Sequence, residues 1–323
     1  MIRWKTARLT AAVLAAVLVA VVAAAWWRDP YSLVRAEYAR QRIALGLQRH
    51  SVVIDGQRWI YVERAAAAAD TPVIVMLHGY TGSKENWYRL AARLEGRYRL
   101  VIPDLPGWGE SQRLPDADYG YAAQAANVAA FIRRVSDKPV VLLGHSMGGG
   151  IAAVVAARYP GEVARVGLLD ASGVRFKDNR FGIDVLAGEN PFGVHDAISF
   201  EHYLGILFYD RSARPWIPSP AARAVIAHRR ADGAFEQSVL DRIGRSDARF
   251  LPGDLASRIA QPALLLWCRQ DAVIDASAMA QYAAKMPQAS RVLLEGCGHM
   301  SLMEQPDAVA AAVTALIEKG RPR

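Results

Sequence analysis

Cysteine is scarce in the 323-residue sequence, which contains only Cys268 and Cys297 and therefore allows a single disulfide at most. The histidines and carboxylates show no spacing typical of metal ligands, so we expect no metal. The stretch after Gly144 lacks the G-x-G-x-x-G pattern of dinucleotide-binding folds, because His145 and Ser146 follow that glycine. The net charge is +8, yet no basic stripe with interleaved aromatic residues accompanies it, which argues against nucleic acid as a partner.

The first thirty residues differ from the rest in composition. Residues 9–27 carry no charge and follow Arg3, Lys5 and Arg8. As a helix, this run would be about 28 Å long, close to the ~30 Å hydrocarbon thickness of a bilayer. A cleaved signal peptide is the alternative, since a basic start, an apolar middle and small residues at 23–25 also match one. We favour an uncleaved transmembrane helix at residues 1–28, because the apolar run exceeds the usual ~7 to 15 residues.

The residues in and after this run bear on assembly and orientation. Alanine recurs at every fourth position from Ala12 to Ala24, and such a stripe allows two helices to pack closely in a bilayer. It predicts a homodimer through the transmembrane helix, although a merely alanine-rich composition is the alternative. The basic residues before the run favour a cytoplasmic N-terminus, but arginines also follow it. Residues 29–50 predict a juxtamembrane helical segment whose arginines could rest on anionic head groups of the bilayer.

Residues 139–159 form the stretch around which the chain is organised. Val140 to Leu143 is a short apolar run suited to a buried strand, and the alanine-rich run after Gly150 suits a helix. Ser146 lies between them, with a glycine two residues before it and another two residues after it. Such a sharp turn lifts the hydroxyl above the sheet edge, at the positive end of the following helix. The pattern resembles the nucleophile elbow of the α/β-hydrolase family, and a connecting turn without chemistry is the alternative.

Two further motifs match the family's pattern. Residues 78–83 read H-G-Y-T-G-S and follow a short apolar run, as the family's oxyanion loop does. The resemblance implies that the backbone N–H groups of Tyr80 and Met147 hold the oxyanion. Residues 104–111 match the family's D-x-P-G-x-G-x-S turn near the pocket, so Asp104 is expected to be structural. His78 is likewise expected to form structural hydrogen bonds.

The acid and the base are expected after the last two predicted strands. Asp271 stands where the family places the aspartate that orients the catalytic histidine, although a cysteine replaces the usual glycine three residues earlier. His299 lies on the loop where the family keeps its general base. The order Ser146, Asp271, His299 is the order of this fold. Asp170, at the end of an earlier predicted strand, is the alternative acid.

The resemblance covers roughly Ser51 to the C-terminus and implies the fold class. It implies an α/β-hydrolase fold, with a mostly parallel central sheet flanked by helices in residues 51–171 and 256–323. Strand signals vanish in residues 172–255, and the resemblance implies that an insertion at this point forms a helical cap over the active site. Seven of the eight phenylalanines lie in this region. They could line an apolar acyl-binding pocket or build the cap's own core, and both interpretations stay open.

The expected chemistry is ester hydrolysis through an acyl-enzyme. His299 would take the proton of Ser146, and Asp271 would fix the tautomer of the imidazole. The chain looks most like membrane-anchored bacterial lipases and esterases, including phospholipase A-type and monoacylglycerol lipase-like enzymes. The resemblance implies a lipid or ester substrate, no cofactor, and a single-pass location in the bacterial inner membrane with a periplasmic catalytic domain. Alternatives are small esters, lactones, thioesters or C–C bonds cleaved by the same residues and, from another class, a non-catalytic receptor.

Cys268 and Cys297 each follow one of the last two predicted strands. Adjacent strands could bring the two thiols together, so a disulfide beside the active site is a hypothesis that requires an oxidising compartment. Two free thiols in protein prepared without reductant would contradict it.

Overall fold

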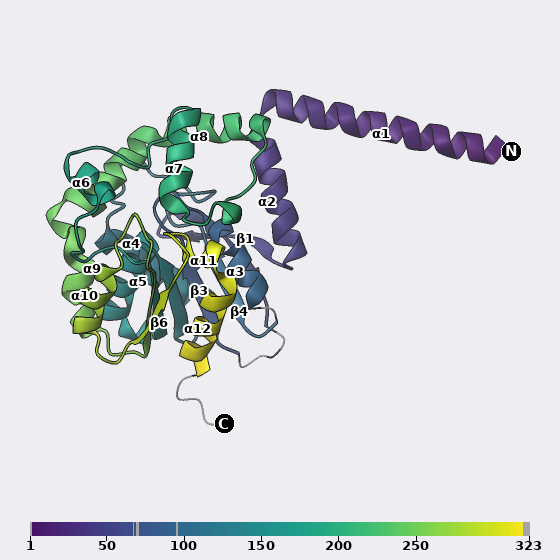
Figure 1. The fold of residues 1–323 in the computed structure, drawn as a ribbon. Helices are drawn as coiled ribbons and strands as arrows, with labels where there is room; N and C mark the ends of the chain where they lie inside the picture. The colour runs from purple at the N-terminus through teal and green to yellow at the C-terminus, as the bar shows by residue number, and fades with distance from the viewer. Residues whose placement is uncertain (1, 67, 69–70, 95, 319–323) are drawn as a thin grey trace.

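The computed structural model describes residues 2–66, 68, 71–94 and 96–318 (Figure 1). An eight-stranded sheet in the order β1-β2-β4-β3-β5-β6-β7-β8 forms its centre. The strands are β1 (Gln48–Ile54), β2 (Gln57–Arg64), β3 (Val73–Leu77), β4 (Arg99–Pro103), β5 (Val140–His145), β6 (Val163–Leu169), β7 (Ala263–Cys268) and β8 (Ser290–Leu294). β2 pairs antiparallel with β1 and β4, and all other pairs are parallel. The predicted mostly parallel sheet is therefore confirmed.

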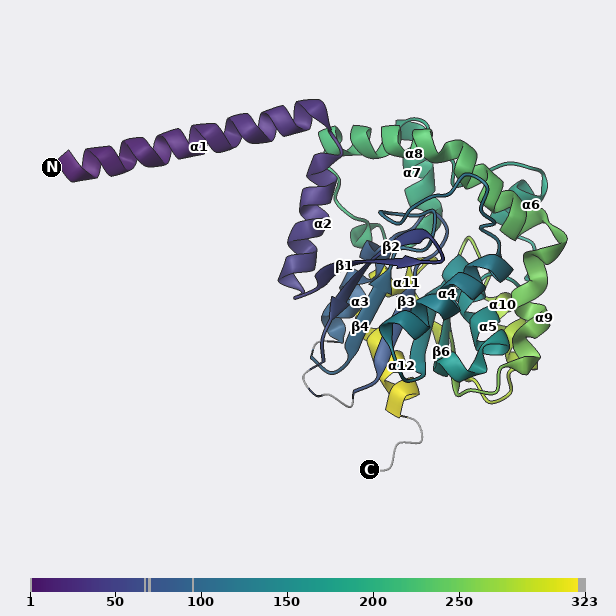
Figure 2. The ribbon, with the colours of Figure 1, turned by 180° about the vertical axis from the view of Figure 1, so that it is seen from behind.

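Helices cover both faces of this sheet. On one face lie α4 (Tyr121–Val135), α5 (Met147–Arg158) and α10 (Ser277–Lys285), whose buried side chains share one hydrophobic cluster. On the other face lie α3 (Tyr88–Arg93), α11 (Ser301–Glu304) and α12 (Pro306–Glu318), which build a second cluster. Figure 2 shows α4 and α5 in front of the sheet. Because apolar layers enclose both faces, every residue of the central strand β5 is buried.

The predicted cap region connects β6 to β7. It contains α6 (Arg180–Leu186), α7 (Ala197–Leu207), α8 (Ser219–Leu240) and α9 (Leu251–Leu255), and a π-helical turn at Asp241–Arg245 follows α8. All of residues 172–255 are described, and they form no strand. α6, α7 and α8 lie over one end of the sheet (Figure 1). This is the arrangement that a helical cap over a site at the strand ends requires.

The N-terminal part of the chain forms two helices. α1 (Ile2–Arg28) projects away from the remainder of the molecule in both views, whereas α2 (Ser32–Ala44) packs against α8 (Figures 1 and 2). The predicted juxtamembrane segment is thus helical, and the core begins at β1, three residues earlier than predicted. Two parts of the predicted segments lie outside the described residues: Met1, which begins segment 1–28, and residues 319–323, which close segment 256–323.

The structure does not support the predicted transmembrane helix. Within the described part of the chain, no helix combines the length and the apolar character needed to cross a membrane. The homodimer predicted through residues 1–28 depends on that helix and is not supported either.

Candidate active site

Ser146 occupies a sharp turn between β5 and α5. Its backbone has φ 55° and ψ −121°, in the region that side chains rarely adopt. A Cβ atom at Gly144 would lie 2.1 Å from the carbonyl oxygen of Gly148, and one at Gly148 would lie 2.3 Å from that of Leu77. Only glycine fits at these two positions, which explains the spacing of glycines around the serine. The turn holds the Ser146 side chain at the strand end, beneath the cap.

Ser146, His299 and Asp271 form one hydrogen-bonded chain. His299 Nε2 lies 2.9 Å from Ser146 Oγ, and His299 Nδ1 lies 2.8 Å from Asp271 Oδ2. The other carboxylate oxygen of Asp271 accepts the backbone N–H groups of Val273 and Ile274 at 2.8 and 3.0 Å. The three residues follow β5, β7 and β8, so the sheet brings together positions far apart in sequence. Sequence reasoning predicted these three residues, and the structure places them in hydrogen-bond contact.

Burial determines the protonation of this chain. It lowers the pKa of His299 to about 3, so the imidazole is neutral at neutral pH and able to accept a proton. Burial raises the pKa of Asp271, and the N–H donors of Val273 and Ile274 oppose that rise. A neutral His299 that donates Nδ1–H to Asp271 leaves the Nε2 lone pair facing Ser146. The arrangement suits transfer of the serine proton to the histidine.

Asp170, the alternative acid, lies beneath the site. Its side chain is fully buried and accepts the backbone N–H of Cys268 and the hydroxyl of Ser301. Within the described residues, no hydrogen bond joins it to His299. Asp170 therefore supports the loops that carry the acid and the base, a role that sequence reasoning missed.

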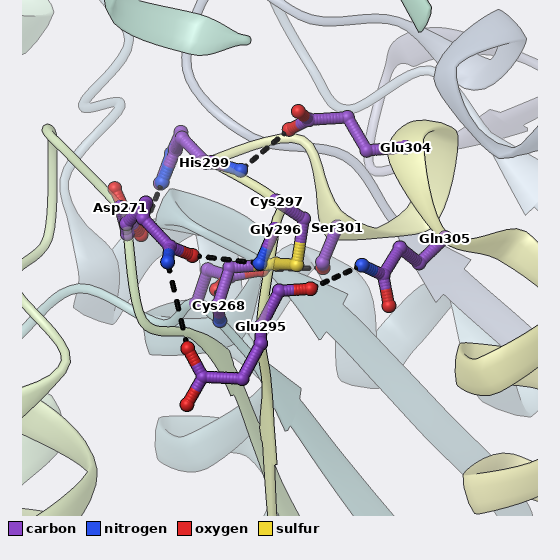
Figure 3. The surroundings of a disulfide bond; sticks show 12 residues. Cys268, Asp271, Glu295, Gly296, Cys297, His299, Ser301, Glu304 and Gln305 are labelled. Carbon is purple, nitrogen blue, oxygen red and sulfur yellow. Dashed lines mark hydrogen bonds and ion pairs between the residues drawn. A yellow bond between two sulfur atoms is a disulfide. The ribbon is translucent and has the colours of Figure 1, made fainter. Parts of the chain in front are cut away.

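A disulfide joins the same two loops. Cys268 and Cys297 are bonded, and both side chains are fully buried (Figure 3). Cys268 lies three residues before Asp271, and Cys297 lies two residues before His299. Glu304 adds a further tie, because its carboxylate accepts the backbone N–H of Gly298 at 2.8 Å. The hypothesis of a disulfide beside the site thus matches the structure.

The predicted oxyanion loop follows β3 and lies against the nucleophile. A Cβ atom at Gly79 would come within 2.9 Å of Ser146 Cβ, so the loop passes as close as a glycine allows. The Tyr80 hydroxyl donates to the carbonyl oxygen of Glu236 in α8, at 2.7 Å, and so fixes the loop to the cap. Met147 is the first residue of α5, where a helix leaves its N–H groups without intrahelical acceptors. Tyr80 and Met147 both line the cavity that contains Ser146.

The residues predicted to be structural have structural partners. His78 Nδ1 lies 2.8 Å from the Gly79 carbonyl, and its Nε2 accepts the backbone N–H of Leu105 at 3.0 Å. Burial lowers the pKa of His78 to about 4, so this ring is neutral. Asp104 is buried against the Lys84 ammonium at 2.8 Å. Both expectations from the sequence agree with the structure.

Two chambers open from Ser146. The smaller has a volume of about 280 Å³ and a mostly apolar wall of cap residues, including Phe181 and Val185. The larger has a volume of about 820 Å³ and lies between the cap, the loop after β3 and α2. Six of the seven cap phenylalanines line a chamber, at 176, 181, 192, 200, 208 and 250, whereas Phe235 packs on Trp108. Four of them, at 181, 192, 200 and 208, are also buried in the hydrophobic core, so both interpretations of the aromatic residues agree with the structure.

The participation of α2 was not predicted from the sequence. Tyr31, Val34, Tyr38 and Gln41 of this segment line the larger chamber. Their spacing of three and four residues is that of one helix face, and this spacing was the signal in the sequence that could have indicated a shared role.

Among the described residues, no group of histidines, cysteines and carboxylates could hold a metal ion.

Known proteins resemble this chain over most of its length. Residues 72–306 match the family model described as the alpha/beta hydrolase fold. The chain is 27% identical to monoacylglycerol lipase ABHD6 of Rattus norvegicus, with 88% of this chain and 86% of the relative covered. It is 28% identical to Lipase 1 of Psychrobacter immobilis, with 85% and 84% covered. A crystal structure described as a membrane phospholipase A, a bacterial virulence factor, superposes with a TM-score of 0.84 at 31% identity, covering 95% of this chain and 97% of that one.

Proposed function

We propose that this chain, which belongs to the α/β-hydrolase family and is a serine ester hydrolase, cleaves acyl esters of lipids with Ser146 as its nucleophile. The hydrogen-bonded chain from Asp271 through His299 to Ser146 carries the proposal. A serine hydroxyl is a weak nucleophile until an adjacent base takes its proton, and the buried neutral His299 meets that need. Asp271 holds the imidazole in the tautomer that leaves Nε2 free to accept.

The reaction proceeds in two halves. Ser146 Oγ attacks the ester carbonyl carbon while His299 Nε2 takes the hydroxyl proton, and the carbonyl oxygen becomes an oxyanion. His299 then gives that proton to the alcohol oxygen, the C–O bond breaks, and the acyl group stays on Ser146. A water molecule, deprotonated by His299, attacks the acyl-enzyme and releases the carboxylic acid with regeneration of the serine.

We assign the oxyanion site to the backbone N–H groups of Tyr80 and Met147. Three observations support this assignment: the loop after β3 approaches Ser146 as closely as Gly79 allows, Met147 begins α5, and both residues line the cavity at Ser146. Loss of one such donor typically costs about 2.7 to 4 kcal/mol of transition-state stabilisation.

The cavity and the relatives support the proposed substrate class. The smaller chamber is mostly apolar, as an acyl chain requires, and the relatives include enzymes named monoacylglycerol lipase and membrane phospholipase A. A buried disulfide between Cys268 and Cys297 fits an oxidising compartment, so we propose that the catalytic domain works in the periplasm. Location at the inner membrane stays a prediction, and cell fractionation tests it.

A substrate panel tests the proposed function. Wild type, Ser146→Ala and Ser238→Ala are assayed with p-nitrophenyl esters of rising chain length, monoacylglycerol and phospholipid. Ser238 lies on the exposed side of α8 and serves as the matched control. We expect lipid hydrolysis by wild type and Ser238→Ala and none by Ser146→Ala. Activity confined to short esters would favour a small-ester hydrolase, and activity that survives in Ser146→Ala would overturn the nucleophile assignment.

A further inference from the structure

We infer that the larger chamber receives the leaving group and that this leaving group is bulky: the substrate is a two-chain lipid, and the alcohol released from it still carries an acyl chain. The inference rests on the proposed function and extends it, because it distinguishes the two lipase types named above. A monoacylglycerol lipase releases free glycerol, whereas an enzyme acting on a diacyl lipid releases a monoacyl lipid.

The positions of the histidine and of the oxyanion donor set the direction of the substrate. Both chambers meet at Ser146 and Tyr80. His299 lies on the wall of the larger chamber, whereas Met147 lies on the wall of the smaller one. The base must come within about 2.6 to 3.2 Å of the alcohol oxygen to protonate it. The alcohol part therefore extends into the larger chamber, and the acyl chain that is cleaved occupies the smaller one.

The volumes indicate the size of each part. The smaller chamber has a volume of 280 Å³ and the larger chamber a volume of 820 Å³, so the larger is about three times as spacious. Free glycerol would fill only a small part of that space. A glycerol unit that still bears an acyl chain and a head group matches it better.

The wall of the larger chamber is amphipathic, as such a leaving group requires. Phe200, Leu204 and Leu207 contribute an apolar stretch from α7. Polar side chains occupy other parts of the wall, among them Gln41 and Thr81. Their amide and hydroxyl groups are donors of the kind that bind ester and head-group oxygens of a lipid.

α2 closes this chamber from outside the catalytic domain. Tyr31, Val34 and Tyr38 face the cavity, and the ring of Tyr31 packs on that of His228 in α8 with centroids 4.5 Å apart. The helix therefore belongs to the substrate site. A bulkier side chain on this wall should obstruct the alcohol part of a substrate and leave its acyl part unaffected.

The test compares substrates that share one acyl chain and differ in the alcohol. Four decanoyl esters are assayed in the same detergent micelles: p-nitrophenyl decanoate, monodecanoyl glycerol, didecanoyl glycerol and didecanoyl phosphatidylcholine. The last two are the two-chain lipids. The enzymes are wild type, Val34→Trp and Ile43→Trp. Ile43 is on the same helix with 68% of its surface exposed, and it is the matched control. We expect Val34→Trp to lower kcat/KM at least tenfold for the two-chain lipids and less than twofold for the p-nitrophenyl ester. Ile43→Trp should change neither value.

Two further variants keep the outcome interpretable. Leu204→Trp fills the same chamber from α7 and should reproduce the selective loss if Val34→Trp does not fold. Val185→Phe narrows the smaller chamber and should shorten the preferred acyl chain for every alcohol. Equal losses on p-nitrophenyl and two-chain esters in both chamber-filling variants would overturn the inference. So would a wild-type kcat/KM that is as high for monodecanoyl glycerol as for the two-chain lipids.

Failure of the proposed function gives a different result. A wild-type enzyme that cleaves none of the lipids, or a Ser146→Ala variant that still cleaves them, would contradict the proposed function before the chambers are compared.

Discussion

The buried carboxylate of Asp170 accepts the backbone N–H of Cys268 at 2.9 Å. It also accepts the hydroxyl of Ser301, two residues after His299. Asp170 thereby connects the segments that carry Asp271 and His299 without contacting the imidazole itself. The two buried aspartates therefore have different partners: Asp271 binds the imidazole ring of His299, whereas Asp170 binds the Cys268 backbone and the Ser301 side chain.

This division of roles predicts opposite effects of the same substitution. Asp271→Asn should lower kcat about 10⁴-fold with little change in stability, because the amide cannot hold the tautomer that exposes Nε2 to Ser146. Asp170→Asn should retain most of kcat and lose about 1 to 3 kcal/mol of unfolding free energy, because an amide replaces the acceptor of two buried donors. Steady-state kinetics and urea unfolding measure both quantities. A larger kcat loss in Asp170→Asn than in Asp271→Asn would reverse the assignment.

Removal of the disulfide should cost both stability and turnover. The cysteines are 29 residues apart, and closing a loop of that size contributes about 3 to 4 kcal/mol in the chain-entropy model. The Cys268→Ala/Cys297→Ala double variant should lose about that much unfolding free energy. Its kcat should fall, since the loops of Asp271 and His299 lose their covalent link. Each single variant should lose at least as much as the double variant; a double variant as stable as wild type would contradict this account.

The pH dependence of kcat/KM should reflect the burial of His299. The reaction needs the neutral imidazole, and burial lowers its pKa from the ordinary 6.5 to about 3. A lowered pKa keeps the base neutral in moderately acidic solution, so the acidic fall in activity should lie below pH 6.5. The position of this acidic fall is measured with a neutral p-nitrophenyl ester between pH 4 and 9. Only pH values at which circular dichroism shows folded protein are used. An inflection at or above pH 7 would contradict the prediction.

His78 should make the free energy of unfolding fall as the solution becomes more acidic. Its pKa is about 4 in the folded protein, against 6.5 ordinarily, so between these values only the unfolded chain binds the proton. The stabilisation is present above pH 6.5 and is lost as the pH falls toward 4, by about 3 kcal/mol in all. His78→Gln removes this titration while its carbonyl oxygen can still accept the Leu105 N–H. Urea unfolding at pH 7 and pH 5 should show a smaller loss in His78→Gln than in wild type.

A second substitution at the same position separates titration from hydrogen bonding. His78→Asn is too short to reach the Leu105 N–H, which His78 Nε2 binds at 3.0 Å. This variant should therefore lose about 1 to 3 kcal/mol more than His78→Gln at pH 7. Equal stability of the two variants would show that the Leu105 hydrogen bond contributes little.

The parts of the site that the sequence predicts are those set by local geometry. Gly144 and Gly148 flank Ser146 because a strand and a helix meet there without room for a Cβ, and such a requirement is visible in a short motif. Asp271 and His299 follow strands, and strand order in a parallel sheet then brings them together. The cap was expected from the resemblance to the family, together with the loss of strand patterns between β6 and β7.

The parts that were missed depend on contacts between distant segments. Asp170 was a candidate acid, and only the positions of Cys268 and Ser301 show that its partners lie below the site. Glu304 links the cap to the histidine loop, because its carboxylate accepts the backbone N–H groups of both Asp210 and Gly298. α2 becomes part of a chamber because it packs on α8, and the sequence of α2 shows only that one of its faces is apolar.

The location of the buried disulfide also sets the order in which the enzyme matures. The oxyanion loop and Ser146 belong to the first half of the chain, whereas Cys268 ends β7 and Asp271, Cys297 and His299 follow it. A nascent chain thus carries its nucleophile long before it has a base. The disulfide can form only after Cys297 has been synthesised, so the covalent link between the loops of the acid and the base is a late step in building the site.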